Sequence, residues 1–145
     1  MNPIEFKNKW NLSYLELAVI LGYKGDRTVR EWETNNQLHR YPQPPANVVC
    51  HLLDQKWQQH GKNIIIGLSL ALNPIEFKNK WQLSYVELAI VLGYTSDRTV
   101  RSWGATGQFH RYPAASACVA AYLLDQQWLE HGKKIIPYFW IKEIA

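Results

Sequence analysis

Two arginines in the first half of the chain have the type and spacing to read nucleic-acid bases. Arg27 and Arg30 lie three residues apart, about one helical turn, and Val29 and Trp32 fall on the opposite side of a helical wheel. Arginine can pair bidentately with O6 and N7 of guanine, and the neighbouring Glu31 can accept a hydrogen bond from cytosine N4. The segment predicts a helix with a base-reading face, although most surface helices carry a polar face that meets only solvent.

Two helices are expected before this one. Asn2, followed by proline and by an acidic residue three positions after the cap, predicts a helix that begins there and ends near Trp10. Ser13 and Glu16 have the spacing of a capping box at the start of a second helix. Gly22 follows as the expected stop of that helix.

The arginine-bearing segment is expected to form a third helix, with Asp26 as its N-cap and its end near Thr34. A loop over 37–45, rich in proline, leads to a fourth helix over about 46–60. Two helices joined by a tight turn that contains glycine, here 13–21 and 26–34, are the sequence signature of a helix-turn-helix.

The whole pattern occurs twice. Residues 2–65 match residues 73–136 at a constant offset of about 71 residues, and roughly 41 of about 64 aligned positions are identical. The sequence therefore predicts an all-α protein of two tandem four-helix domains, at 1–66 and 73–136. An apolar connector over 67–72 is expected to fix the two copies relative to each other, and an aromatic tail over 137–145 follows the second copy. The connector or the tail could form a homodimer contact.

The chain resembles the Cro/phage-repressor type of helix-turn-helix domain, which is XRE-like and has the lambda-repressor-like fold. The motifs are Leu12-Ser13-x-x-Glu16-Leu17-Ala18-x-x-Leu21-Gly22 and Arg27-Thr28-Val29-x-x-Trp32-Glu33, and the resemblance covers about residues 6–57 and 77–128. It implies a DNA-binding protein, commonly a transcriptional repressor of a phage, plasmid or other mobile element, in a prokaryotic, nucleoid-associated setting. The turn from Gly22 to Val29 is about one residue longer than usual. A Thr-Val-Arg-x-Trp-Glu string also occurs in MerR-like domains, where a wing follows the recognition helix.

The loop after the third helix carries one more arginine in each copy. His39-Arg40-Tyr41-Pro42 recurs as His110-Arg111-Tyr112-Pro113. The resemblance implies that this loop contacts the phosphate backbone, which gives position but no sequence information; alternatively, the tyrosine and proline pack and the arginine is merely solvated. The candidate DNA-binding residues are Lys24, Arg27, Thr28, Arg30, Glu31 and Arg40 in the first copy, and Thr95, Ser96, Arg98, Thr99, Arg101, Ser102 and Arg111 in the second.

The groove-facing positions differ more between the copies than the scaffold does. Arg27 and Arg30 persist as Arg98 and Arg101, whereas Glu31 becomes Ser102. The shared arginines predict a common part of each half-site, and the changed position predicts a difference in base preference. Because the second copy loses acidic residues here, we expect it to bind DNA at least as tightly as the first.

Composition sets limits on other functions. A net charge of +4 and a pI near 9.1 over 145 residues suit nucleic acid, but also an ordinary soluble surface. Cys50 and Cys118 do not align between the copies and form no metal-ligand pair, so we expect no metal and no cofactor. The longest apolar run, at 64–72, is too short to span a membrane, and the N-terminal residues do not resemble a signal peptide, which favours a cytoplasmic protein.

The sequence favours a sequence-specific double-stranded DNA-binding regulator with one recognition helix per repeat. The alternative is an interaction or assembly adaptor of a mobile element, motivated by the apolar connector and the aromatic tail. No catalytic arrangement stands out, and Asp54 and Asp125 are expected to be solvated helix residues, so we do not expect an enzyme.

Overall fold

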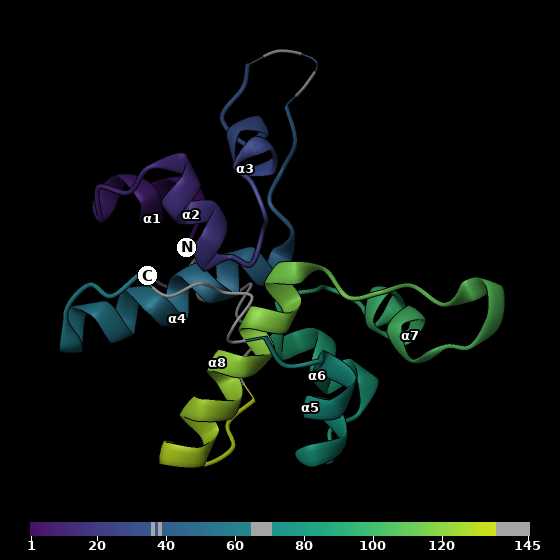
Figure 1. Ribbon diagram of the computed structural model, residues 1–145. Helices are drawn as coiled ribbons and strands as arrows, with labels where there is room; N and C mark the ends of the chain where they lie inside the picture. The colour runs from purple at the N-terminus through teal and green to yellow at the C-terminus, as the bar shows by residue number, and fades with distance from the viewer. Residues whose placement is uncertain (36, 38, 65–70, 136–145) are drawn as a thin grey trace.

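The computed structural model describes residues 1–35, 37, 39–64 and 71–135. Within these ranges the protein is all-α, with eight α-helices, one short 3-10 helix and no strand (Figure 1). The first half contains α1 (Pro3–Lys9), α2 (Tyr14–Ile20), α3 (Arg27–Glu31) and α4 (Pro44–His60), and the second contains α5 (Pro74–Lys80), α6 (Tyr85–Val91), α7 (Arg98–Gly104), η2 (Gly107–Phe109) and α8 (Ala115–His131). The prediction of an all-α fold with an internal duplication is confirmed.

The division of the chain into two separate domains stays a prediction. The predicted connector is described only at Ala71 and Leu72, and the predicted tail at 137–145 lies outside the described residues. No helix in the described ranges is both long enough and apolar enough to cross a membrane.

The start and end of α2 follow from local chemistry. The Ser13 hydroxyl accepts a hydrogen bond from the Glu16 amide at 3.0 Å, and the Glu16 carboxylate accepts one from the Ser13 amide at 2.8 Å. The helix ends in a Schellman motif, in which Gly22 has φ +91° and the amide of Tyr23 donates to the carbonyl of Ala18. These bonds fix where the chain leaves α2 and therefore the direction in which α3 begins.

The third helix begins after Asp26, as predicted, but it lacks the expected side-chain cap and ends early. The Asp26 side chain makes no capping bond, because its carboxylate instead accepts from Nε of Arg30 at 2.9 Å. The helix ends at Glu31 and not near Thr34, because the Glu31 carbonyl accepts from the Thr34 hydroxyl at 3.1 Å and from the Arg40 amide at 3.0 Å. The chain therefore turns out of the helix early and returns past it as a loop.

In each half, an aromatic cluster packs the first helix against the long helix. Phe6 and Trp57 have ring centroids 5.1 Å apart, and Trp10 meets Trp57 edge-on at 5.3 Å. The indole N–H of Trp10 donates to Asp54 at 2.9 Å, and Lys9 Nζ lies 2.8 Å from the same carboxylate. The second half repeats this cluster with Phe77, Trp81, Trp128, Asp125 and Lys80. The expectation that Asp54 and Asp125 are solvated was wrong: each side chain is 14% exposed and ties the end of one helix to the long helix of its half.

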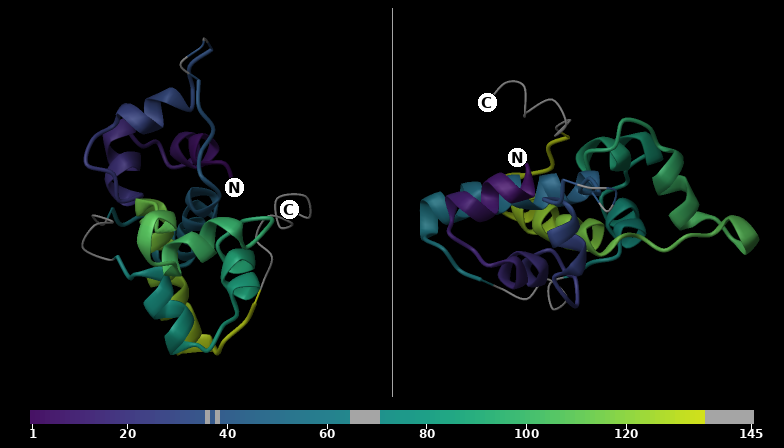
Figure 2. Two further views of the ribbon diagram at one scale, coloured as in Figure 1. Left: turned by 90° about the vertical axis from the view of Figure 1, so that its right-hand side faces the viewer. Right: turned by 90° about the horizontal axis from the view of Figure 1, so that it is seen from above.

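The two halves meet where α4 crosses α8, and their buried residues form one continuous cluster (Figures 1 and 2). The contacts at this junction are reciprocal. A Cβ placed on Gly22 would lie 3.2 Å from Val119 Cγ2, and a Cβ placed on Gly93 would lie 3.2 Å from Val48 Cγ2. Val119 and Gly93 occupy in the second half the positions of Val48 and Gly22 in the first. Exchanged contacts of this kind are those of a two-fold axis, so the halves are arranged as a pseudo-symmetric dimer within one chain.

Candidate nucleic-acid interface

The α3 helix buries one side in the core and presents its arginines on the opposite, exposed side. Val29 is fully buried and Trp32 is 6% exposed, whereas Arg27 has 94% of its side chain exposed. Lys24, in the turn before α3, is also exposed. The predicted division of this helix into a core face and a polar face is confirmed.

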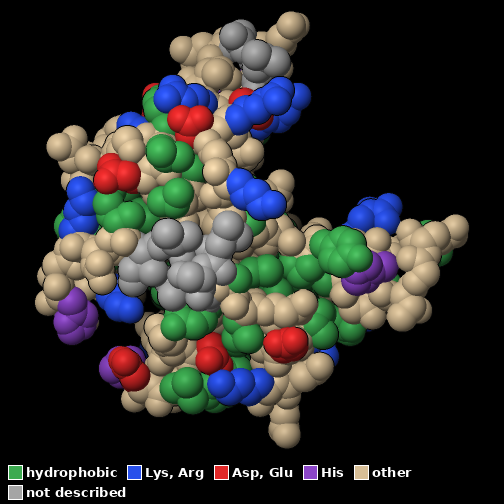
Figure 3. Space-filling model, in the orientation of Figure 1, with side chains coloured by type: hydrophobic (Ala, Val, Ile, Leu, Met, Phe, Trp, Pro, Cys, Tyr) green, Lys and Arg blue, Asp and Glu red, His purple; other side chains and the backbone are tan. Residues whose placement is uncertain are grey.

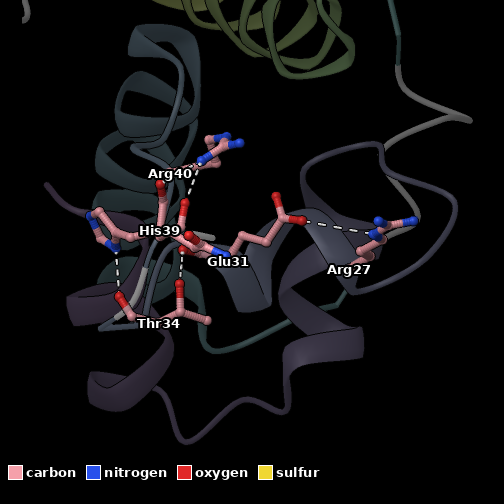
Figure 4. A network of polar contacts seen from close by, with 6 residues as sticks. Arg27, Glu31, Thr34, His39 and Arg40 are labelled. Carbon is pink, nitrogen blue, oxygen red and sulfur yellow. Dashed lines mark hydrogen bonds and ion pairs between the residues drawn. The ribbon is translucent and has the colours of Figure 1, made fainter.

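Arg27 is weakly held by its neighbour. Its Nε lies 3.7 Å from the Glu31 carboxylate, one helical turn away, and Figure 4 shows the pair extending along the outer side of α3. An exposed pair of this kind contributes about 0.3–0.5 kcal/mol, so it constrains the arginine without immobilising it. Figure 3 shows Lys and Arg side chains mixed with acidic ones at the end of the molecule that α3 forms.

Arg30 is held in a different way. Its guanidinium is bonded to Asp26 and lies 4.6 Å from the ring centre of Tyr14, which comes from the first turn of α2. In the second half, Arg101 bonds to Asp97 at 2.6 Å and lies 5.0 Å from the ring centre of Tyr85. Tyr14 was missed from the sequence, although its persistence as Tyr85 was a visible signal. These contacts orient the guanidinium across the α2–α3 turn, and they leave Arg27 and Arg98 as the less restrained arginines.

The second half offers a freer arginine. Ser102 replaces Glu31, and the Ser102 hydroxyl donates to the Thr99 carbonyl at 2.6 Å, so Arg98 faces no carboxylate at the corresponding position. Arg98, Thr99, Ser102 and Arg111 line one side of an open groove of about 570 Å³. The structure therefore brings four of the seven predicted residues of this half along a single hollow beside α7.

The groove also receives a residue from the other half. Gln43, immediately before α4, lines it together with the exposed aromatic side chains of Phe109 and Tyr112. The groove beside α7 is thus lined by residues from both halves.

The loops after α3 and α7 are held by a repeated set of bonds. His39 Nδ1 lies 2.8 Å from the Thr34 carbonyl oxygen, and the Arg40 guanidinium donates to the His39 carbonyl at 3.0 Å (Figure 4). The His39 ring meets Tyr41 edge-on at 4.6 Å, while Tyr41 remains 81% exposed. The second half repeats these contacts through His110, Arg111 and Tyr112, with Tyr112 at 86% exposure. In the alternative for this loop, the packing of the tyrosine was therefore wrong, whereas the prolines are half-buried and the arginines exposed.

Most of the predicted site residues face outward. The exposed ones are Lys24, Arg27, Arg30, Arg40, Thr95, Ser96, Arg98, Thr99, Arg101 and Arg111, and the partly exposed ones are Thr28, Glu31 and Ser102. Whether any of them contacts DNA stays a prediction.

The cysteines lie away from this surface. Cys50 is buried in α4, and burial raises the pKa of its thiol far above the ordinary value; partial burial also raises the pKa of Cys118. A raised pKa keeps a thiol protonated and poorly reactive. Among the described residues, no group of three or more His, Cys, Asp or Glu side chains could hold a metal ion.

Compared with known protein families, with curated proteins and with solved structures, the chain shows no match to any of them.

Proposed function

We propose that this protein is a sequence-specific double-stranded DNA-binding regulator, a transcriptional repressor, with α3 and α7 as recognition helices of two lambda-repressor-like helix-turn-helix units. The observation that carries the proposal is the repeated design of α3 and α7. Each helix is anchored by a buried Val-x-x-Trp pair and presents two arginines on its exposed side. An exposed helix with arginines on its outer side suits the major groove, where guanine offers two acceptors to one guanidinium.

The turn between the helices supports this proposal. The Schellman motif at Gly22 and the stack of Arg30 on Tyr14 fix α3 against α2. A side chain that reads a DNA base needs a helix in a fixed position. Its hydrogen bonds discriminate between bases only when their geometry is held. The loop arginines, Arg40 and Arg111, would contact the phosphates on either side and set the register of each unit.

The pseudo-two-fold axis gives the expected form of the site. Two reading heads related by a two-fold axis fit two half-sites in inverted orientation, as in symmetric dimers. Because Glu31 in one head is Ser102 in the other, the preferred site should be an imperfect inverted repeat with one half different from the other. The fused chain supplies both heads at a fixed effective concentration, and this raises affinity without new contacts.

The test begins with selection of bound duplexes from a random pool, followed by salt-titrated binding. We compare wild type with the double variant Arg27→Ala, Arg98→Ala. The matched control is Lys62→Ala, Lys133→Ala, which removes two charges at the far ends of α4 and α8, where each lysine bonds a tryptophan carbonyl. The arginine variant should lose at least tenfold in affinity and lose sequence preference, while the control should lose little.

Two results would contradict the proposal. The first is an arginine variant that binds its selected duplex as well as wild type does. The second is wild-type protein without a steep salt dependence or any selected sequence, together with a stable protein complex in its place; this would favour the assembly adaptor. The segments that motivated the adaptor, the connector and the tail, lie mostly outside the described residues.

A further inference from the structure

A pocket of about 230 Å³ lies beside the crossing of α4 and α8, away from the predicted DNA-binding residues. Its walls come from both halves: Leu53 and Trp57 belong to α4, whereas Val119 and Leu123 belong to α8. These side chains are buried and apolar. Pockets at the interface between two structural units are common binding sites for small molecules.

Lys56 and Tyr122 bring hydrogen-bond donors to this pocket, whose other polar side chains are those of His60, Asn63 and Gln126. Lys56 lines it and pairs with no carboxylate among the described residues, and no Asp or Glu is among its described lining residues. Tyr122 also lines it, and its hydroxyl oxygen already accepts a hydrogen bond from the Gln126 amide at 2.6 Å. The hydroxyl hydrogen of Tyr122 is therefore left to donate to a further acceptor. An ammonium and a phenol hydrogen beside an apolar wall suit a ligand with an anionic head and an apolar body.

The duplication shows that this combination is specific to one side of the molecule. The positions that match Lys56 and Tyr122 in the other half are Gln127 and His51. The apolar walls persist, since Leu53 and Trp57 return as Leu124 and Trp128. This pocket and the pseudo-symmetric set of positions therefore share their apolar side chains. They differ in their polar groups, and only this pocket has both the ammonium and the phenol.

We infer that this pocket binds a small monocarboxylate with one aromatic ring or a branched aliphatic body. An apolar cavity of about 150 Å³ takes benzene, so a space of this size takes one ring with a short acidic side chain. The carboxylate would accept from Lys56 and Tyr122, and the ring would lie against Trp57 and Leu123. The inference does not depend on DNA binding, because none of these residues belongs to the proposed reading heads.

The test uses the full chain without DNA and 3-phenylpropionate as the probe, with 3-phenylpropanol as the uncharged analogue, in calorimetric titrations. Lys56→Gln and Tyr122→Phe introduce small changes, the first being the residue found at the matching position. Lys62→Gln is the control, because it removes the same charge from a lysine that does not line the pocket.

The acid should bind with a stoichiometry of one. Lys56→Gln should weaken its binding about tenfold or more and Tyr122→Phe severalfold, because a hydrogen bond to a charged group is being lost. The alcohol should bind wild type more weakly than the acid does, and Lys62→Gln should bind the acid as wild type does. A failure of the acid to bind at millimolar concentration would overturn the inference. Equal binding by wild type and the two pocket variants would overturn it as well, because the acid would then be held elsewhere.

Discussion

Replacing Gly22 by alanine tests whether the two halves meet as the structure places them. The new Cβ would sit at φ +91° and 3.2 Å from Val119 Cγ2, closer than ordinary contact. A non-glycine residue at positive φ costs about 1–2 kcal/mol, and crowding in a packed junction adds about 1 kcal/mol or more. We therefore expect Gly22→Ala to lower the free energy of unfolding by about 2–3 kcal/mol.

The backbone cost alone does not identify the junction, so the decisive quantity is the coupling to Val119. In a Val119→Ala background, the methyl group that crowds the new Cβ is gone. The cost of Gly22→Ala should then fall by about 0.5–1.5 kcal/mol, the usual size of coupling between residues in contact. Val48→Ala is the matched control, because Val48 is the pseudo-symmetric mate of Val119 and faces Gly93. Gly22→Ala and Val48→Ala should be additive within about 0.5 kcal/mol.

Urea unfolding of the full chain, followed by tryptophan fluorescence and by circular dichroism, measures each free energy. The reciprocal cycle, with Gly93→Ala, should couple to Val48→Ala and not to Val119→Ala. Additivity in all four pairs, or coupling in the control pairs in place of the contacting ones, would refute the pseudo-two-fold junction.

Three further predictions concern charge and ionisation. If α3 and α7 read DNA as proposed, Glu31→Ser should tighten DNA binding about two- to fivefold by removing a carboxylate from the proposed DNA-facing surface, and Ser102→Glu should weaken it, both measured by fluorescence anisotropy at fixed salt. The capping bond from the Ser13 amide holds the pKa of Glu16 below its ordinary 4.5. The resulting stabilisation is complete above pH 4.5 and is lost as the pH falls through the lowered pKa, so Glu16→Gln, which removes the carboxylate that the Ser13 amide bonds, should destabilise at neutral pH and less so in acid, as thermal unfolding across pH can measure. Burial raises the pKa of Tyr94 to about 12, so stability should decline as the pH rises from 10, and Tyr94→Phe should remove one phenolate step near pH 12 in an ultraviolet titration.

The sequence predicted those parts of the fold that local chemistry decides. The capping box at Ser13, the glycine stop at Gly22 and the inward side of the third helix, with Val29 and Trp32, all depend on residues within a few positions of one another. Asp26 occupies the predicted N-cap position, but its carboxylate bonds Arg30, four residues later, and makes no capping bond.

What the sequence could not predict depends on contacts between distant positions. The bond between Trp10 and Asp54 joins residues that are far apart in the chain, so no local pattern distinguishes Asp54 from a solvated helix residue. The Tyr14–Arg30 stack and the entry of Gln43 into the groove beside α7 have the same origin. Above all, the reciprocal packing of Gly22 and Gly93 sets how the two halves are oriented, and it depends on residues of α4 and α8 that lie far away in the sequence.

The reciprocal junction also makes the order of synthesis matter. The first half leaves the ribosome before α8 exists, so Val48, which is 1% exposed in the complete chain, begins without its final neighbour. Because Gly22 and Val48, one from each side of the reciprocal contact, are both present in the first half, we expect two first halves from different nascent chains to be able to pair through equivalent contacts. Pairing within one chain therefore competes with pairing between chains. The first requires the synthesis of residues 73–135, and the second requires contact with another nascent chain. Slow translation, or many ribosomes on one mRNA, should increase the fraction of chains that are linked through their first halves. Each half in such a linked species would still be folded.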